Sequence, residues 1–238
     1  LGIIFADHPE EMYAVRKDSP LIVGHTKDGS IIASDVPAVL KYTRDVVFIQ
    51  NEEIVKLTED KLEFYNIDEE VIEKETTHID WDVNAAEKGG YEHFMLKEMY
   101  EQPKAILDTF SPRIKGNEVV IDELGMSDDE IRAVKKIMIV ACGSAYHVGV
   151  VGQYVLEDLA KIPVRVEIAS EFRYRRPLLK SDDLVIIISQ SGETADSLAA
   201  LRLAKEKGVK TLAIVNVIGS SIAREADSVF YTLAGPEI

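Results

Sequence analysis

Residues 189–194 of this 238-residue chain place hydroxyls, an amide and a glycine side by side in the order Ser-Gln-Ser-Gly-Glu-Thr. An unbroken apolar run, residues 184–188, precedes them, and an Ala- and Leu-rich segment follows, so we expect a loop between a buried strand and a helix. Backbone N–H groups at a helix N-terminus carry a partial positive charge, and serine and threonine hydroxyls can donate to an oxygen. The pattern predicts an anion site with phosphate as its natural ligand.

A simpler alternative is that Ser191 and Thr194 only cap the helix, as serine and threonine often do in such loops. One capping residue would be enough for that purpose, so the surplus of hydroxyls favours the anion site. The chain has no Walker-type Gly-Lys-Ser/Thr, which argues against hydrolysis of a nucleoside triphosphate.

A second loop of small residues, Cys142-Gly143-Ser144-Ala145, follows the apolar run 136–141. Gly143 would let the backbone approach a ligand closely, and Ser144 could cap the next helix or contact the ligand. Cys142 is the only cysteine, and a lone cysteine at a strand end is usually a small buried apolar residue. We expect ligand contacts from this loop and assign no catalytic residue in the chain.

A scaffold must bring these loops together. From residue 134 onward, apolar runs alternate with helical patterns, and the strands are expected at residues 136–141, 164–168, 184–188 and 210–216. Such alternation implies a parallel sheet between helical layers, with ligands beyond the carboxyl ends of the strands. The predicted fold class is α/β, a three-layer α/β/α domain, with chemistry in the two loops above and in a third, residues 217–221.

Helical patterns join the expected strands. In the helix after the 142–145 loop, the apolar residues that share one face are Val148, Val151, Val155 and Leu159. Before the α/β region, residues 91–103 also have a helical pattern, and Pro103 is expected to end that helix.

The first part of the chain has a different pattern. Up to about residue 66, short apolar runs are separated by turn-like pieces, which indicates antiparallel strands and hairpins. The next residues, to 90, are acidic and poorly periodic, which is typical of a linker. We therefore expect an antiparallel β segment over residues 1–66, a linker with a helix over 67–127 and the α/β domain over 128–238.

Composition and charge exclude several classes of protein. Hydrophobic residues make up 46% and charged residues 29% of the chain, which fits a folded protein. The net charge is −15, and because residues 131–238 carry 14 basic and 12 acidic residues, the first 130 carry −17. The electrostatic field of this negative charge repels polyanions, so nucleic acid is not an expected partner.

No apolar run approaches the roughly 18 residues of a membrane span, so we expect no membrane partner. A single cysteine favours a reducing compartment, so we expect a cytoplasmic location.

These motifs resemble those of a known family. Residues 141–147, 166–175 and 188–196 are similar to the first sugar isomerase (SIS) domain of the glutamine:fructose-6-phosphate aminotransferases. Residues 91–103 resemble the segment before that domain, and residues 19–24 and 31–35 resemble the end of the glutaminase domain. The resemblance implies that residues 1–66 are the C-terminal part of a class II glutaminase domain and residues 128–238 the first SIS domain.

For the intact enzyme, the resemblance implies ammonia transfer from glutamine to fructose-6-phosphate and isomerisation to glucosamine-6-phosphate, with no metal or organic cofactor. For this chain it implies binding of fructose-6-phosphate or glucosamine-6-phosphate, and a homodimer formed through SIS domains. The residues that match the family's phosphate contacts are Ser189, Gln190, Ser191 and Thr194, with Cys142, Gly143 and Ser144 against the sugar.

The chain also departs from the family pattern. The family's glutaminase nucleophile is an N-terminal cysteine, whereas position 1 is Leu1, and the family's catalytic lysine and glutamate would lie beyond Ile238. We therefore expect an interior fragment that is inactive alone. Where the family usually has Thr-Ser after Cys-Gly, this chain has Ser144-Ala145, so residue 145 offers no hydroxyl to the phosphate, although a backbone N–H could serve there instead.

Two alternatives remain open. An SIS fold can act as a non-catalytic sensor of sugar phosphates, but such regulators usually add a basic helix-turn-helix domain, and the acidic first part offers none. A purely structural module would leave the hydroxyl-rich loop unexplained.

Overall fold

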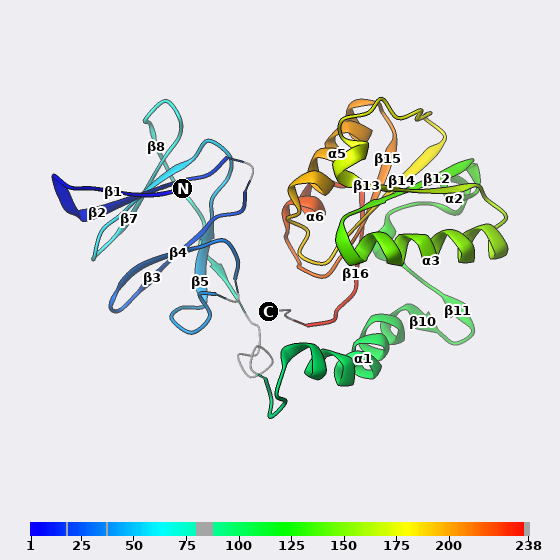
Figure 1. The fold of residues 1–238 in the computed structure, drawn as a ribbon, viewed down its shortest axis with the longest axis horizontal. Coiled ribbons are helices and arrows are strands. Elements are labelled where there is room, and N and C mark those ends of the chain that lie inside the picture. Colours follow the sequence, from blue (N-terminus) through cyan, green and yellow to red (C-terminus); the bar gives the residue numbers. More distant parts are fainter. Residues whose placement is uncertain (18, 37, 80–87, 236–238) are drawn as a thin grey trace. The chain divides into compact units, whose positions relative to one another are not determined.

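A computed structural model describes residues 1–17, 19–36, 38–79 and 88–235 (Figure 1). The chain divides into two compact units, Leu1–Lys97 and Glu98–Gly235. The first is built from antiparallel strands, and the second contains a parallel sheet with helices. No helix among the described residues is long and apolar enough to cross a membrane.

The first unit contains two sheets, with strand orders β1-β2-β6-β7-β8 and β4-β3-β5-β9, and each neighbouring pair is antiparallel. Its strands are β1 Gly2–Phe5, β2 His8–Val15, β3 Ile22–Thr26, β4 Gly29–Ala33, β5 Asp45–Phe48, β6 Ile54–Leu57, β7 Leu62–Tyr65, β8 Val71–Ile72 and β9 Thr77–His78. The antiparallel region thus extends past residue 66, because β8 pairs with β7 and β9 with β5. Residues 80–87 of the expected linker lie outside the described residues.

The two sheets share a core because side chains alternate along the strands. Val23 and Val47 pack with Ala14 and Val55 of the other sheet. Their neighbours Ile22 and Val46 point to the opposite face and belong to a second apolar cluster. Alternate residues of these strands are therefore buried on opposite faces of the sheet.

The second unit contains a parallel sheet with the order β13-β12-β14-β15-β16. Its strands are β12 Lys136–Ala141, β13 Val164–Ile168, β14 Asp183–Ser189, β15 Lys210–Val215 and β16 Ser228–Tyr231. The larger helices are α3 Gly143–Leu159 and α5 Ala195–Glu206, with the short helices α2 Asp128–Ala133, α4 Ala169–Phe172 and α6 Ser221–Glu225. The predicted parallel α/β fold is confirmed, and β16 is a strand that the sequence pattern did not indicate.

Alternate residues of β12 show the three layers. Met138 and Val140 pack with α5 and α6 in one apolar cluster, whereas Ile137 and Ile139 belong to a second cluster that includes Leu156 of α3. Since neighbouring strand residues point to opposite faces, α5 and α3 cover opposite sides of the sheet. Strands covered on both faces explain the unbroken apolar runs in the sequence.

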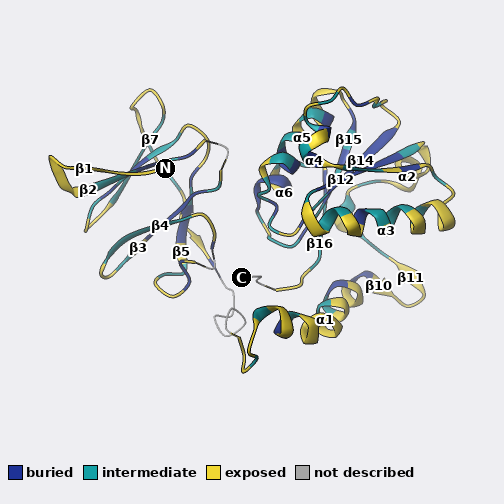
Figure 2. Ribbon diagram, in the orientation of Figure 1, coloured by how far each residue is buried: buried dark blue, intermediate teal, exposed yellow. Residues whose placement is uncertain are grey.

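Helix α3 uses small residues against the sheet. A Cβ on Gly149 would lie 2.9 Å from Ile139 Cγ2, so only glycine allows this close approach. The apolar face predicted for α3 is present but points away from the sheet: its residues, Val148, Val151, Val155 and Leu159, are between 48% and 76% exposed (Figure 2).

Helix α1 runs over Phe94–Phe110 and continues through Pro103, so the expectation that Pro103 ends the helix was wrong. Proline removes one backbone donor, but later contacts hold the last turns. Buried Arg113 donates from Nη1 to Thr109 O (2.6 Å) and from Nη2 to Tyr231 O of β16 (2.9 Å). The contact with Tyr231 joins residues far apart in the sequence, which local pattern cannot reveal. Between α1 and α2 lie the 3-10 helices Ser111–Arg113 and Asp122–Leu124 and the hairpin β10 Ile114–Lys115 and β11 Glu118–Val119.

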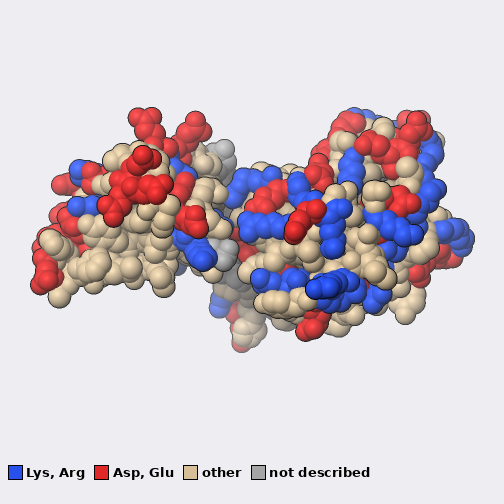
Figure 3. Space-filling model, turned by 90° about the horizontal axis from the view of Figure 1, so that it is seen from above, with Lys and Arg blue, Asp and Glu red and all other residues tan. Residues whose placement is uncertain are grey.

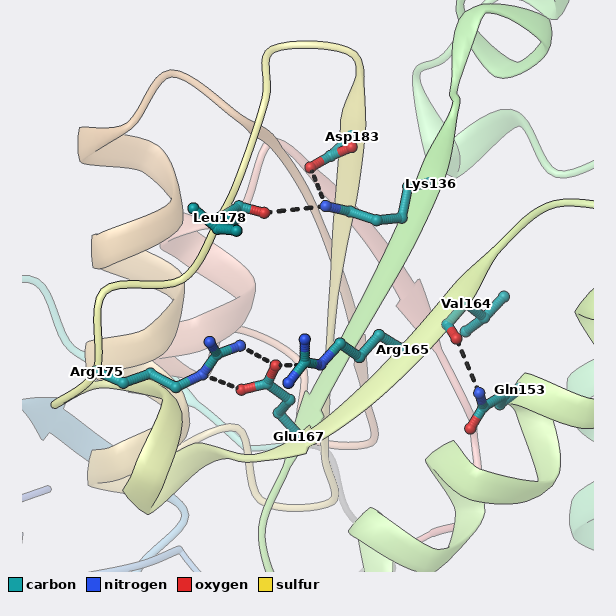
Figure 4. Close-up of polar contacts among 8 residues, drawn as sticks. All are labelled: Lys136, Gln153, Val164, Arg165, Glu167, Arg175, Leu178 and Asp183. Atoms are coloured by element: carbon teal, nitrogen blue, oxygen red, sulfur yellow. Dashed lines mark hydrogen bonds and ion pairs between the residues drawn. The ribbon is translucent and has the colours of Figure 1, made fainter.

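Ion pairs lie at both ends of the sheet, at the amino end between β12 and β14 and near the carboxyl end on β13 (Figure 4). Lys136 and Asp183 face each other at the first residues of β12 and β14, with Nζ 2.7 Å from the Oδ2 of the buried aspartate. On the edge strand β13, Glu167 accepts from Arg165 Nε at 2.8 Å and also pairs with Arg175.

Figure 3 shows acidic side chains predominating on the visible face of the first unit and both signs mixed on the second.

Candidate functional site

Two loops meet where β12 and β14 end. Ala141 and Ile188 are partners in the parallel register, so the loops that follow them start side by side. Between these loops lies a cavity of about 230 Å³. Its lining residues are Cys142, Gly143, Ser144, Ala145, Ile188, Ser189, Gln190, Ser191 and Thr194. The structure thus brings all seven predicted contact residues to one cavity.

Hydroxyl groups fold the 189–194 loop upon itself. Buried Ser189 accepts the Gly192 N–H at its Oγ (3.1 Å) and lies 3.1 Å from Thr194 Oγ1, while Ser191 Oγ accepts the Glu193 N–H (3.2 Å). Two loop N–H groups are therefore already bonded within the loop. Each hydroxyl can both donate and accept, so Ser191 can still donate to an anion, and so can one of Ser189 and Thr194, because the other donates in the bond between them.

The capping alternative does not hold for this loop. Thr194 is the N-cap residue of α5, yet its side chain makes no capping hydrogen bond, and Ser191 bonds within the loop instead. The hydroxyls are therefore not used to satisfy the first turn of α5. Those first-turn N–H groups have no acceptor inside the helix and are suited to an anion.

Gly192 is required by its surroundings. Its φ is +65°, and a Cβ would lie 2.0 Å from the Oγ of Ser220. A side chain at this position would be strained and would clash, so the glycine allows the 189–194 loop to lie against the start of α6.

The 142–145 loop has no charged side chain. Gly143 has a φ of +56°, which turns the chain from β12 into α3. Cys142 is partly buried, packs against the core of the sheet and accepts a long contact from Ser197 Oγ at 3.8 Å. Ser144 is exposed at the cavity, and Ala145 lines it without a hydroxyl.

Two carboxylates close to the 189–194 loop are held by partners. Glu193 Oε1 accepts the Ser221 N–H (2.7 Å), and Asp196 Oδ1 accepts from Arg173 Nη1 (2.7 Å). Neither carboxylate lines the cavity. The lining is uncharged, so an anion there would be bound by neutral donors rather than by lysine or arginine.

The third predicted loop, residues 217–221, does not line this cavity, and the expectation of chemistry there stays a prediction. It packs behind the 189–194 loop instead: Ser220 lies against Gly192, and the Ile222 N–H donates to Gly192 O (3.0 Å). This position follows from the path of the chain, because β15 pairs with β14 and the residues after β15 lead into α6.

Sequence reasoning missed Ile188 as a lining residue, although it adjoins Ser189. It also missed Asn216, whose hydrogen bonds connect the 189–194 loop with residues 234 and 235. The Asn216 N–H donates to Gln190 O (3.0 Å), and its side chain bonds Ala234 N and Gly235 O. Among the described residues, no group of three or more His, Cys, Asp or Glu is arranged to hold a metal ion.

Comparisons with known proteins point to one family. The SIS domain model matches residues 130–238. The chain is 59% identical over its full length to glutamine–fructose-6-phosphate aminotransferase (isomerizing) from Clostridium acetobutylicum and 52% identical to that from Clostridium tetani. Among solved structures, the C-terminal domain of glucosamine-fructose-6-phosphate aminotransferase from Francisella tularensis is 44% identical and superposes with a TM-score of 0.59, covering 64% of this chain and 43% of that one.

The chain spans 39% of the length of these two clostridial relatives. The match extends through both compact units and includes the two loops that line the cavity. Over its whole length the chain is homologous to one portion of the glutamine–fructose-6-phosphate aminotransferases, and its residues 130–238 are an SIS domain.

Proposed function

We propose that this chain is the sugar-phosphate-binding portion of a cytoplasmic enzyme that makes glucosamine-6-phosphate and glutamate from fructose-6-phosphate and glutamine. The clostridial relatives carry the name of that activity and align with the whole chain. In this proposal, residues 1–66 are the C-terminal part of a glutaminase domain, 67–127 a linker with a helix and 128–238 the first SIS domain.

The observation that carries the proposal is the uncharged, hydroxyl-rich cavity at the adjoining ends of β12 and β14. The hydroxyls of Ser189, Ser191 and Thr194 and the amide of Gln190 would hold the phosphate. The α5 N-terminus points its first N–H groups to the same place. Cys142, Gly143 and Ser144, at the N-cap and the first turn of α3, would contact the sugar.

The mechanism of this portion is binding and orientation. Neutral donors can bind a dianionic ester without neutralising it, and hydrogen bonds to a charged group contribute about 1.5–3 kcal/mol each. Fixing the phosphate orients the carbonyl end of the sugar toward groups that would come from the rest of the longer relatives. We assign no proton transfer to a residue of this chain.

Calorimetric titration tests the phosphate site. In the double variant Ser191→Ala with Thr194→Ala, fructose-6-phosphate should bind at least about tenfold more weakly, since 1.4 kcal/mol is one decade. Fructose is the matched ligand and should bind far more weakly than its phosphate ester. Equal affinities of wild type and variant, or of fructose and fructose-6-phosphate, would contradict the proposal.

The chain alone should show neither glutaminase nor synthase activity. The single cysteine of these 238 residues, Cys142, lies in the SIS domain and outside residues 1–66, and we assign no residue of this chain to the isomerisation. Purified chain incubated with glutamine and fructose-6-phosphate should release no glutamate above a boiled control. Measurable release would show that the assignment of residues 1–66 is wrong.

We also propose that the SIS domain forms a homodimer and that α3 contributes to the contact. Its exposed aliphatic and aromatic residues are Val148, Val151, Tyr154, Val155 and Leu159, and the polar residues His147, Glu157 and Asp158 of this helix are exposed as well (Figure 2). Burying such a surface is favourable by about 25 cal/mol per Å². Sedimentation should show a dimer that Val151→Glu with Val155→Glu dissociates. A monomeric wild type would mean that another part of the longer relatives covers this face.

A further inference from the structure

We propose that Glu193 is a positioning residue for phosphate binding: its carboxylate, held by the backbone of α6, fixes the 189–194 loop in the shape that turns its hydroxyls to the cavity. The inference rests on the proposed function, because it concerns how the same site is kept ready for a phosphate ester. It adds a residue that does not line the cavity itself.

Both ends of Glu193 are fixed. Its backbone N–H donates to Ser191 Oγ (3.2 Å), and its side-chain Oε1 accepts the Ser221 N–H (2.7 Å). The residue therefore joins a hydroxyl of the cavity wall to the first residue of α6. A shift of the Glu193 side chain would move the Ser191 hydroxyl with it.

The other ties between this loop and its support use the backbone. Gly192 O accepts the Ile222 N–H (3.0 Å), and Gln190 O accepts the Asn216 N–H (3.0 Å). Both bonds use loop residues before Glu193, whereas Glu193 is the residue directly before Thr194, where the loop turns into α5. Glu193 thus controls the part of the loop in which two phosphate-facing hydroxyls are expected.

The direction of the carboxylate matters because the expected ligand is an anion. A carboxylate facing a phosphate at close range would repel it. In the structure the Glu193 carboxylate is instead bonded to an N–H on the far side of the loop from the cavity. A direct charge effect and a positioning effect therefore predict opposite results on removal of the side chain: tighter binding for the first, weaker for the second.

The test is titration of the 238-residue chain with fructose-6-phosphate and with fructose. Glu193→Ala should weaken fructose-6-phosphate binding by about tenfold, the loss of roughly one hydrogen bond to a charged ligand. Glu193→Gln keeps an oxygen acceptor for the Ser221 N–H and should bind within about threefold of wild type. An affinity close to wild type in Glu193→Gln would show that the hydrogen bond to the Ser221 N–H, and not the negative charge of the carboxylate, supports phosphate binding.

Ser221→Pro removes the donor of the same bond from the other side. Proline is favoured at the first position of a helix, and Ser220 before it already has an extended conformation (ψ 161°). This variant should weaken binding like Glu193→Ala, and the two together should be no worse than either alone. If Glu193→Ala does not fold, Ser221→Pro still tests the same hydrogen bond.

Glu225→Ala is the matched control. Glu225 is a carboxylate at the other end of α6, where it accepts from Arg202 Nε (2.8 Å) and Nη2 (2.7 Å) of α5. The control should lower the melting temperature but leave the affinity unchanged. Unchanged affinity in Glu193→Ala and Ser221→Pro, or an equal loss in Glu225→Ala, overturns the inference. A wild type that binds fructose-6-phosphate no better than fructose overturns the proposed function itself.

Discussion

The two ends of the parallel sheet are built from different chemistry. At the amino end, β12 and β14 begin with opposite charges, Lys136 and Asp183, and the carboxylate is almost fully buried. At the carboxyl end, the loops after the same two strands carry hydroxyls, an amide and glycines, and no charged side chain lines the cavity between them. The same pair of strands therefore carries its charge at one end and its neutral donors at the other.

This contrast separates stability from binding. A buried ion pair is important for stability mainly because removal of one partner leaves the other charge buried and unpaired. A binding site made of neutral donors can instead accept a charged ligand without first breaking an internal ion pair. Changes at the amino end should thus affect unfolding, and changes at the carboxyl end should affect affinity.

The largest expected effect is at the amino end. Lys136→Ala removes the partner of buried Asp183 and also the bond from Nζ to Leu178 O (3.0 Å). We expect a loss of about 3 kcal/mol in the free energy of unfolding, the lower part of the range for such pairs, because the Lys180 N–H still donates to Asp183. Urea denaturation measures it, and fructose-6-phosphate affinity should not change.

The double variant Lys136→Met with Asp183→Leu is the control. Replacing a whole buried ion pair by apolar residues is often neutral, so most of the lost stability should return. A double variant as unstable as Lys136→Ala would show that the shape of these side chains, not the pairing of their charges, supports this end of the sheet.

Sequence pattern predicted much of this arrangement. The strands β12 and β14 are apolar runs buried on both faces, and parallel neighbours necessarily end at the same edge. This is why two loops that lie far apart in the chain could be placed at one edge of the sheet from the alternation of strands and helices, whereas the pairing of β12 with β14 is seen only in the structure. The hydroxyls of the 189–194 loop were recognised because their number exceeds what capping needs.

What the sequence could not predict depends on contacts between distant residues. Helix α1 passes Pro103 because Arg113 joins its end to β16, and α3 turns its valines outward because Gly149 lets the helix approach Ile139. The support given by Glu193 to the loop was equally hidden, because it requires α6 to start beside Gly192.

A smaller effect is expected at the carboxyl end. Ala145 lines the cavity at the position where the family usually has a hydroxyl. Ala145→Ser would add one donor to the phosphate, so we expect about threefold to tenfold tighter binding of fructose-6-phosphate and unchanged unfolding. Fructose affinity is the control: an equal gain for fructose would mean that residue 145 faces the sugar rather than the phosphate.

The smallest effect concerns a second ion pair at the amino end, on the surface. Glu130 of α2 accepts from Lys210 Nζ (2.8 Å), the first residue of β15, and from both the N–H and the hydroxyl of Ser127. These contacts, with Lys210 the largest, lower the pKa of Glu130 from its ordinary value near 4.5 to about 2. Because the folded state favours the ionised carboxylate, this contribution is present above about pH 4.5 and is lost as the pH falls toward 2.

Glu130→Gln tests that contribution against the buried pair. The melting temperature of the variant should lie slightly below that of wild type at pH 7, and the two should converge as the pH approaches 2, because protonated glutamate and glutamine then pair equally poorly with Lys210. The difference at pH 7 should shrink with added salt, since the pair is solvent-exposed. A loss of stability as large as that of Lys136→Ala, or one that does not change with pH, would contradict the expectation that the exposed Glu130–Lys210 pair stabilises the fold less than the pair of Lys136 with buried Asp183.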